Sequence, residues 1–565
     1  MRVLAQTITW SDLARVDVDE CGHEGRTALR AAAWSGQKSI VIRLLEYNAD
    51  VNKKDVEGRS ALMASSYKNH FDIVSILLQA GADPNLADKS GATALHLALS
   101  NQSDVYDRHQ TIIELLQNGA DVNLEDINGW NCVHVAAYHG DLNLESIIKS
   151  CRNVDAQPIE LEYGEKFQDK SGRTALMLAA CLGNTRSCQQ LIDHGADIDF
   201  IDNEGRTALI HAAIHNNLEI VQLLLNLGAD EAHKDNDGAV ALHFAVSHRN
   251  LDLCSALCTS VTVQISDKYG NHPLIIAAQR SDVKVSKSEV VQLLLDTGAP
   301  INLQSHNGQS ALRSAALAGN DSIVKCLAAH VSVSGEKCDL NQCDLNGTPL
   351  LHALIVARNM QMVSLLLDLG CSISSCDSYH RYSTHFVAQA FFSIFNRSEY
   401  FIIITGLHAA ILKEHGGNFE AQDEAGRTPL MTAVWASNYD IAYFLLEDIG
   451  VQPNEIDYEG ATALNIAAHI GQRDLVILLL KFGAEPSHCD KLGRTAADVA
   501  QLAGHESIRQ ILKNASGSAD SSGFGSLPMS PSDQTMKYIQ KKPDIRANTV
   551  NFTCQKALSH YLPHS

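Results

Sequence analysis

Histidine is abundant enough in this chain to raise the question of metal or acid–base chemistry. The 565 residues include 25 histidines. His96, His134 and His243, however, each end a string of the same type, such as Thr-Ala-Leu-His at 93–96. Imidazoles placed once per repeated string lie far apart, and each can bridge backbone groups through its two ring nitrogens. We therefore expect structural histidines and no metal site.

The 14 cysteines show no spacing typical of zinc or redox centres. No Cys-x-x-Cys string occurs, but Cys254 and Cys258 stand four residues apart, as on one face of a helix. Two interpretations remain: small core residues, which we favour, or half of a metal site that lacks a matching second pair. Free thiols suit a reducing compartment. We expect a cytoplasmic protein without a cofactor, which would reach the nucleus or endosomes only through partners.

Aspartates recur at a nearly constant interval, three residues before a glycine. Such side chains accept hydrogen bonds from turn amides, and carboxylates spread along a chain cannot converge on one substrate. The strings of P-loops, zinc proteases (His-Glu-x-x-His), serine hydrolases (Gly-x-Ser-x-Gly) and protein kinases are also missing. The residue pattern predicts a protein that is not an enzyme and has no catalytic residues.

An internal repeat organises these residues. The glycine of a recurring string, Asp-x-x-Gly-x-Thr-x-Leu, falls at Gly25, Gly58, Gly91, Gly129, Gly172, Gly205, Gly238, Gly270, Gly308, Gly347, Gly426, Gly460 and Gly493. The commonest interval is 33 residues, and the one interval of 79 holds two repeats, one of them degraded. This makes 14 repeats, 13 of them clear. Stacked repeats escape the size limit of a single core, so one long array replaces several globular domains.

The first repeat shows what each one must build. Thr27 precedes an alanine-rich segment and is expected to cap a short helix that Gly36 ends. Apolar residues at helical spacing from Ile40 to Leu45 predict a second helix, and a turn follows. The residues expected to open the first helix are Thr27, Ser60, Thr93, Thr174, Thr207, Ser310, Thr348, Thr428, Thr462 and Thr495, with Asn131 as a further cap.

This pattern resembles the ankyrin repeat, in both its period and its Thr-Pro-Leu-His-like string. The resemblance covers about residues 19–514 and implies an all-α solenoid of about 14 helix-loop-helix repeats with protruding turns. It further implies a non-catalytic scaffold or adaptor that binds a partner protein on its concave face and turn tips. Two alternatives stay open: a substrate adaptor of a ubiquitin ligase, because the end of the chain is faintly similar to a SOCS box, and the ankyrin portion of a larger enzyme or channel.

Departures from the period divide the chain. Residues 1–18 are expected to be a leader or partial repeat, 19–376 regular repeats, and 423–514 repeats that end in a polar cap. Residues 377–422 form a degenerate repeat, and 515–565 a disordered tail rich in Ser, Gly and Pro.

The degenerate repeat carries His380 where the other repeats have the turn glycine. Loss of glycine at a position of positive φ costs turn stability. We therefore expect a distorted repeat there and a hinge in the array. Other extra residues, near 101–110, 151–168, 280–288 and 331–343, predict surface loops or partner contacts.

Aromatic residues at one position of the repeat are the first candidates for partner binding. The resemblance implies that the ninth residue after the turn glycine stays free for partners. This residue is aromatic at Trp34, Tyr67, Tyr138 and Trp435, and Trp130 lies at a nearby turn. Trp and Tyr supply large contact areas and dominate the energetics of interfaces. The alternative is that these rings pack against neighbouring first helices of the same chain.

Arginines that follow the turn glycine are the second candidates, above all Arg26 and Arg59. They either contact an acidic or phosphorylated partner or pair with carboxylates of this chain.

The net charge of −21 bears on the class of partner. An acidic chain does not neutralise phosphates, so we expect no nucleic-acid binding. The longest apolar stretch, around 400–412, is too short for a membrane span, and the N-terminus has no signal-peptide pattern. We expect a monomer without direct membrane insertion, whose protein partners expose basic or apolar groups.

Overall fold

The computed structural model describes residues 17–101, 105–151, 168–279, 287–332, 335–389 and 409–517. These residues form helices in pairs, one pair for each of the 14 repeats, and no strands beyond isolated bridges. No helix among them combines the length and the apolar composition that a membrane crossing needs. The expected all-α solenoid is confirmed.

The chain divides into two compact units. Of the described residues, 17–277 and 287–300 belong to the N-terminal unit, and 278–279 and 301–517 to the C-terminal unit. The helix pairs up to residue 300 are α2 (Ala28–Trp34) and α3 (Lys38–Glu46), α4 (Ala61–Tyr67) and α5 (Phe71–Gln79), α6 (Ala94–Ser100) and α7 (Val105–Gln117), α8 (Cys132–His139) and α9 (Leu144–Cys151), α10 (Ala175–Leu182) and α11 (Thr185–Asp193), α12 (Ala208–Ile214) and α13 (Leu218–Asn226), α14 (Ala241–His248) and α15 (Leu251–Leu257), α16 (Pro273–Gln279) and α17 (Lys287–Asp296).

The helices after residue 300 continue the pattern. They are α18 (Ala311–Leu317) and α19 (Asp321–Ala329), α20 (Leu350–Val356) and α21 (Met360–Asp368), α22 (Ser383–Gln389) with a helical segment at 409–414, α24 (Pro429–Trp435) and α25 (Tyr439–Phe444), α26 (Ala463–Ile470) and α27 (Arg473–Lys481), α28 (Ala496–Leu502) and α29 (Glu506–Gly517). Short helical turns, η2 (His23–Gly25), η3 (Thr262–Gln264) and η4 (Leu445–Ile449), complete the set.

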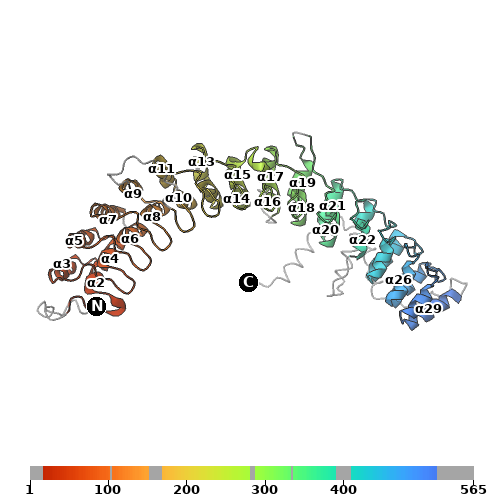
Figure 1. Cartoon of the computed structure of the whole chain (residues 1–565). Helices are drawn as coiled ribbons and strands as arrows, with labels where there is room; N and C mark the ends of the chain where they lie inside the picture. Colours follow the sequence, from red (N-terminus) through yellow and green to blue (C-terminus); the bar gives the residue numbers. More distant parts are fainter. Residues whose placement is uncertain are drawn as a thin grey trace, which may run out of the picture. The chain divides into compact units, whose positions relative to one another are not determined.

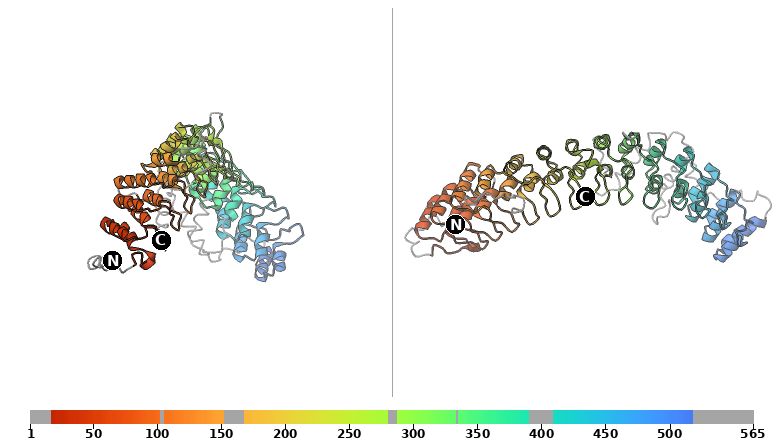
Figure 2. Two further views of the ribbon diagram at one scale, coloured as in Figure 1. Left: turned by 60° about the vertical axis from the view of Figure 1, so that its left-hand side comes forward. Right: turned by 45° about the horizontal axis from the view of Figure 1, so that its top comes forward.

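Within the N-terminal unit the first helices of the repeats form one row and the second helices another (Figure 1). The turns between repeats extend beyond the first helices, as the rotated views also show (Figure 2). The core lies between the two rows. Leu29 and Ala33 of α2 and Val41 of α3 are fully buried, and the small alanine lets neighbouring first helices approach closely. The face opposite the second helices is therefore left for other contacts.

Hydroxyl caps open most first helices, as expected. Thr27 Oγ1 accepts from the Arg30 amide at 3.2 Å, and Ser60 Oγ from the Met63 amide at 3.3 Å. The prediction for Thr348 was wrong by one residue. Pro349 holds the cap position of α20, and proline offers neither a hydroxyl nor an N–H.

Most turns are small hairpins that an aspartate closes, while Gly22 and Ser305 hold its position in the hairpins of Gly25 and Gly308. Asp55 Oδ1 accepts from the backbone amides of Glu57 (2.9 Å) and Arg59 (2.8 Å). Successive hairpins also bond to each other, as in Lys89 N–H to Glu57 O at 2.9 Å. Such bonds recur from the hairpin of Glu24 to that of Lys268. The turn aspartates thus have the structural role that the sequence indicated.

The degenerate repeat keeps the hairpin and both helices. His380 adopts φ 55° at the place of the turn glycine, a conformation that strains a side chain with a Cβ. The inter-helix residues 390–408 lie outside the described residues. The extra residues near 331–343 build a second hairpin, in which Val331 pairs with Lys337. The other predicted insertions fall wholly or partly outside the described residues, as do the leader up to residue 16 and the tail from 518, including its SOCS-like end.

Candidate protein-binding surface

The ninth residue after the turn glycine lies on the exposed side of each first helix. Trp34 at the end of α2 and Tyr67 at the end of α4 stack face to face, with ring centroids 5.6 Å apart and planes 7° from parallel. The rings remain 41% and 37% exposed. Both sequence-based alternatives are thus partly right: the rings pack on each other, and they still offer an aromatic surface to solvent.

The ammonium group of Lys68 covers part of this stack. Its Nζ atom lies 4.5 Å from the centre of the Trp34 ring and 5.8 Å from that of Tyr67. A hollow of about 230 Å³ adjoins the rings, lined by Arg30, Trp34, Arg59, Met63, Ala64, Tyr67 and Leu97. Lys68 is part of this surface although the sequence reasoning, which followed aromatic residues, did not single it out.

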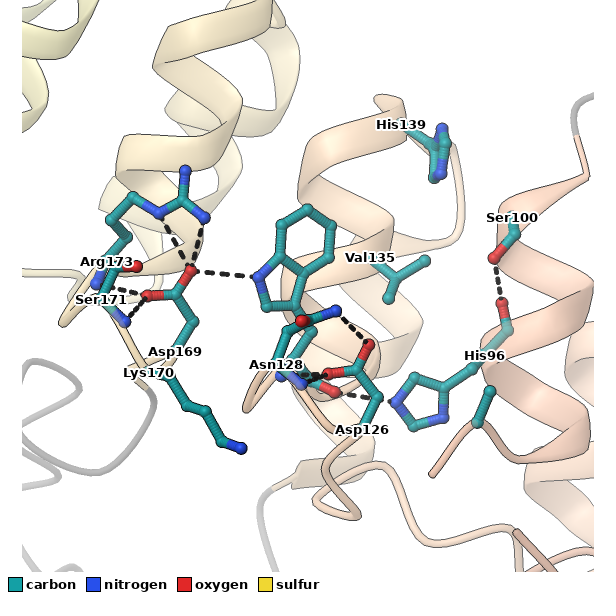
Figure 3. Close-up of a pocket in the computed structure, with 12 residues that line it drawn as sticks. His96, Ser100, Asp126, Asn128, Val135, His139, Asp169, Lys170, Ser171 and Arg173 are labelled. Atoms are coloured by element: carbon teal, nitrogen blue, oxygen red, sulfur yellow. Dashed lines mark hydrogen bonds and ion pairs between the residues drawn. The ribbon is translucent and has the colours of Figure 1, made fainter. Parts of the chain in front are cut away.

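A larger pocket, of about 490 Å³, lies on the same row between the third and fifth repeats (Figure 3). Trp130 lines it, and the Trp130 ring packs at 5.1 Å against Tyr138 at the end of α8. Both side chains are half-buried. The structure therefore brings the four N-terminal aromatic candidates together as two pairs, Trp34 with Tyr67 and Trp130 with Tyr138.

One wall of this larger pocket is an ion pair in the hairpin before α10. Arg173 Nε donates to Asp169 Oδ2 at 2.9 Å, and Arg173 Nη2 lies 2.8 Å from the same oxygen. Trp130 Nε1 also donates to Asp169 Oδ2, at 3.0 Å. Burial alone would raise the pKa of Asp169, but the hydrogen bonds from Arg173 and Trp130 outweigh it and lower that pKa. The carboxylate is ionised and fully engaged at neutral pH.

The histidines of the pocket are uncharged at neutral pH. Burial lowers the pKa of His96, whose Nε2 lies 3.0 Å from the Trp130 carbonyl oxygen. Burial, with a smaller contribution from Arg108, also lowers the pKa of His139. His96 Nδ1 lies 2.8 Å from the Thr93 hydroxyl, so the ring bridges two repeats. The expected structural role of His96 is confirmed, as it is for His243, whose Nε2 lies 3.1 Å from the Asn271 carbonyl oxygen.

The two candidate arginines both pair within the chain. Arg26 Nη2 lies 2.5 Å from Glu24 Oε2, and Arg59 Nε lies 3.4 Å from Asp88 Oδ2. Their side chains are about half exposed, so a partner would meet them as ion pairs.

A further aromatic candidate lies in the C-terminal unit. Trp435 is 54% exposed and stacks on His469 of the next repeat at 6.4 Å. Val356, at the same position of its own repeat, is 60% exposed. The sequence analysis selected aromatic residues and therefore did not include Val356, although counting nine residues from Gly347 finds it.

The cysteine pair shows no sign of metal binding. Burial raises the pKa of Cys254 to about 12, and the Cys258 thiol donates to Thr297 Oγ1 at 3.2 Å. No group of three or more potential metal ligands occurs among the described residues. A protonated, buried thiol is a poor ligand, which agrees with a role in the core.

Comparison with known families identifies the repeat. The family described as ankyrin repeats in three copies matches residues 50–126, 157–235 and 281–377, and the single ankyrin repeat matches 24–56, 425–458 and 459–491. Together these matches cover more than half of the chain. The chain belongs to the ankyrin repeat family. Ankyrin repeats form protein–protein interaction modules, and proteins of the family are generally not catalytic.

Several ankyrin-repeat proteins are similar to part of the chain. Rabankyrin-5 of Mus musculus is 29% identical over 194 residues, which are 33% of this chain and 16% of that protein. Inversin of Mus musculus is 26% identical over 38% of this chain and 19% of that protein. The NF-kappa-B p105 subunit of Gallus gallus is 25% identical over 36% and 16%. The match thus spans less than a fifth of each relative.

Proposed function

We propose that this ankyrin-repeat protein is a non-catalytic scaffold or adaptor that holds a partner protein against the first-helix row of its N-terminal unit. The observation that carries the proposal is the stacked pair Trp34 and Tyr67, two large rings that pack on each other and stay about 40% exposed. Rigid, exposed aromatic rings of this kind supply binding energy at low entropic cost.

The surroundings of the ring pair support binding of a protein segment. The hollow beside the rings has apolar walls from Met63, Ala64 and Leu97, and Lys68 adds a cation at the edge. An apolar centre with a polar rim is the usual anatomy of an interface. Arg26 and Arg59 contribute to that rim as ion pairs, and Trp130 and Tyr138 extend the surface along the same row.

The proposal includes a second contact region and a location. Trp435 in the C-terminal unit, 54% exposed, would bind another part of the partner or a second partner. The degenerate repeat at 377–422 lies between the regular repeats and acts as a hinge within the C-terminal unit. The free thiols, which suit a reducing compartment, support a location in the cytoplasm.

The test compares partner capture by three forms of the full chain in affinity purification with quantitative mass spectrometry. Trp34→Ala with Tyr67→Ala should lower the capture of specific partners about tenfold or more, since two interface aromatics are lost. The matched control is Tyr47→Ala with Tyr106→Ala, which removes two exposed tyrosines associated with second helices. Circular dichroism checks that helicity is kept. Equal capture by all three forms would contradict the proposed surface.

A further inference from the structure

Most turn aspartates pair with an arginine, but Asp126, which lines the larger pocket, does not. Where arginine follows the turn glycine, or follows His380 in its place, its guanidinium commonly binds the aspartate four residues earlier, as in Arg173 with Asp169, Arg381 with Asp377, Arg427 with Asp423 and Arg494 with Asp490. Nε and Nη2 both approach the Oδ2 atom, at 2.7 to 3.0 Å. Elsewhere the arginine comes from the preceding repeat, as in Arg59 with Asp88. The Oδ1 atom of each aspartate accepts hydrogen bonds from the turn amides, so Oδ2 is the oxygen that pairs with the guanidinium.

Asp126 has neither kind of arginine. Its own repeat carries Trp130 after the glycine, and the preceding repeat carries Ala92. The Trp130 indole turns to Asp169 of the next hairpin, at 3.0 Å. Asp126 Oδ1 accepts from the backbone amides of Asn128 (2.7 Å) and Trp130 (2.9 Å), while Oδ2 accepts from the Asn128 side-chain amide at 3.3 Å. Among the described residues Asp126 therefore forms no ion pair.

Two other turn aspartates, Asp267 and Asp457, also form no ion pair within the described part of the chain, yet Asp126 differs from both. It lines the pocket of about 490 Å³ that Ala92, Trp130, His139 and Lys170 also line (Figure 3). Like Asp267 and Asp457 it is half-buried, whereas most turn aspartates that hold an arginine are buried. The carboxylate thus faces a cavity on the first-helix row where elsewhere a guanidinium would lie.

We propose that this pocket binds an arginine side chain of the partner protein, which takes the place of the missing repeat arginine. The guanidinium would donate to Asp126 Oδ2 in the manner of the internal pairs and lie against the Trp130 ring, an arrangement that favours arginine over lysine. The inference deepens the proposed function, on which it rests: the bound segment is one that carries an exposed arginine. The net charge of −21 is complementary to such a segment.

The other titratable groups of the pocket affect how strongly it should bind an arginine side chain. Arg173 is neutralised by Asp169, and His96 and His139 are uncharged at neutral pH. Lys170 is exposed and forms no ion pair within the described part of the chain, so its ammonium opposes a second cation. Replacing Lys170 with glutamine should therefore strengthen binding, and added salt should weaken it.

The experiment uses the full chain labelled with 5-fluorotryptophan and follows ¹⁹F NMR signals during titration with N-acetylarginine amide. The chain has four tryptophans, and a Trp130→Phe variant assigns the Trp130 signal. That signal should shift and saturate with the arginine probe. N-acetylcitrulline amide, which has the same shape without the charge, should bind about tenfold more weakly or not at all.

Three variants test the placement. Asp126→Asn keeps the turn acceptor Oδ1 and should weaken arginine binding about tenfold. Ala92→Arg should abolish binding, because the new side chain reaches Asp126 as Arg59 reaches Asp88. Asp457→Asn, the matched control at an equivalent turn, should leave binding unchanged. The signals of the other tryptophans show whether each variant stays folded.

The inference is overturned if citrulline and arginine probes bind equally, or if Ala92→Arg or Asp126→Asn binds like the wild type. Because the probe needs no partner protein, this result is separate from the capture test. Loss of capture with Trp34→Ala and Tyr67→Ala can stand even when the arginine probe fails to bind.

Discussion

One position of the repeat shows how a single residue depends on its neighbour. The fifth residue after the turn position is histidine in five repeats, at His96, His134, His243, His352 and His385. At four of these the ring accepts a hydrogen bond from the backbone N–H of the cap residue, as His96 does from Thr93 at 3.3 Å. At His352 the cap residue is Pro349, which has no N–H. Nδ1 of His352 therefore lacks the bond that the other rings accept, and both of its ring nitrogens are buried without a hydrogen-bond partner among the described residues.

His352→Met should therefore stabilise the protein, since methionine holds the same position at Met63, Met177 and Met431. Burial lowers the pKa of His352 from 6.5 to about 4, so the unfolded chain takes up a proton at that residue before the folded chain does. Stability from this group is full above pH 6.5 and is lost as the pH falls towards 4. The gain from the variant should grow by roughly 2 kcal/mol between pH 7 and pH 5.

The check is urea unfolding of wild type and His352→Met at pH 7, 6 and 5. Parallel loss of stability in the two proteins would show that His352 does not titrate as the structure indicates.

For single residues, the sequence predicted local structural roles well but predicted poorly which side chains contact each other across repeats. Thr27 and Ser60 cap as expected because a cap bond is local. The unpaired Asp126 was not foreseen, because it depends on the Trp130 indole turning to a carboxylate 39 residues away. A signal was present, since Ala92 and Trp130 stand where other repeats have arginine.

One second helix in the C-terminal unit shows how a helix accommodates an extra residue in its repeat. The interval from Gly426 to Gly460 is 34 residues, one more than the period. After α25 the chain makes a π-helical turn over Leu445–Ile449, which ends at Gly450 with φ 83°. A π-turn accommodates one additional residue while the buried face stays in register. Leu445 and Leu446 are indeed buried there.

Deleting Asp448 should convert this π-turn to an α-helical end, because the remaining Leu-Leu-Glu-Ile-Gly matches the Leu-Leu-Lys-Phe-Gly that ends α27. We expect a loss of stability below about 1 kcal/mol. The matched control, deletion of Ile477 within α27, rotates Leu478 and Leu479 away from the core and should cost several kcal/mol. Thermal unfolding by circular dichroism measures both. Equal destabilisation by the two deletions would contradict the register argument.

The elements were the most predictable part of the fold, since the 33-residue period places both helices and the hairpin of each repeat. The π-turn was not predicted, because one extra residue can enter a loop or a helix and only packing decides between them. The second hairpin at Val331 and Lys337 escaped prediction for the same reason.

The whole molecule is a series of repeats whose stability is the sum of each repeat and its contacts with the next. The degenerate repeat should be the weakest member of the C-terminal unit. His380 at φ 55° costs about 1–2 kcal/mol. A local cost of this size raises the population of opened states about tenfold.

Hydrogen exchange followed by mass spectrometry should show about tenfold faster exchange in α22 and residues 409–414 than in α24 and α26. His380→Gly removes the strain and should slow that exchange, while Asp457→Asn, which leaves the degenerate repeat untouched, should not. Protection of the degenerate repeat equal to that of its neighbours would contradict the proposed hinge.

The backbone bonds between successive hairpins have a mechanical consequence. Within the N-terminal unit they link each repeat to the next, from Glu24 to Lys268. A pull on the ends of this unit would load such links one after another, and the weakest would yield alone. Each failure frees a repeat of about 33 residues, roughly 110 Å of extended chain. The unit would therefore lengthen in equal steps. Because each repeat can refold on its neighbour, the unit would act as a spring between the molecules bound at its two ends.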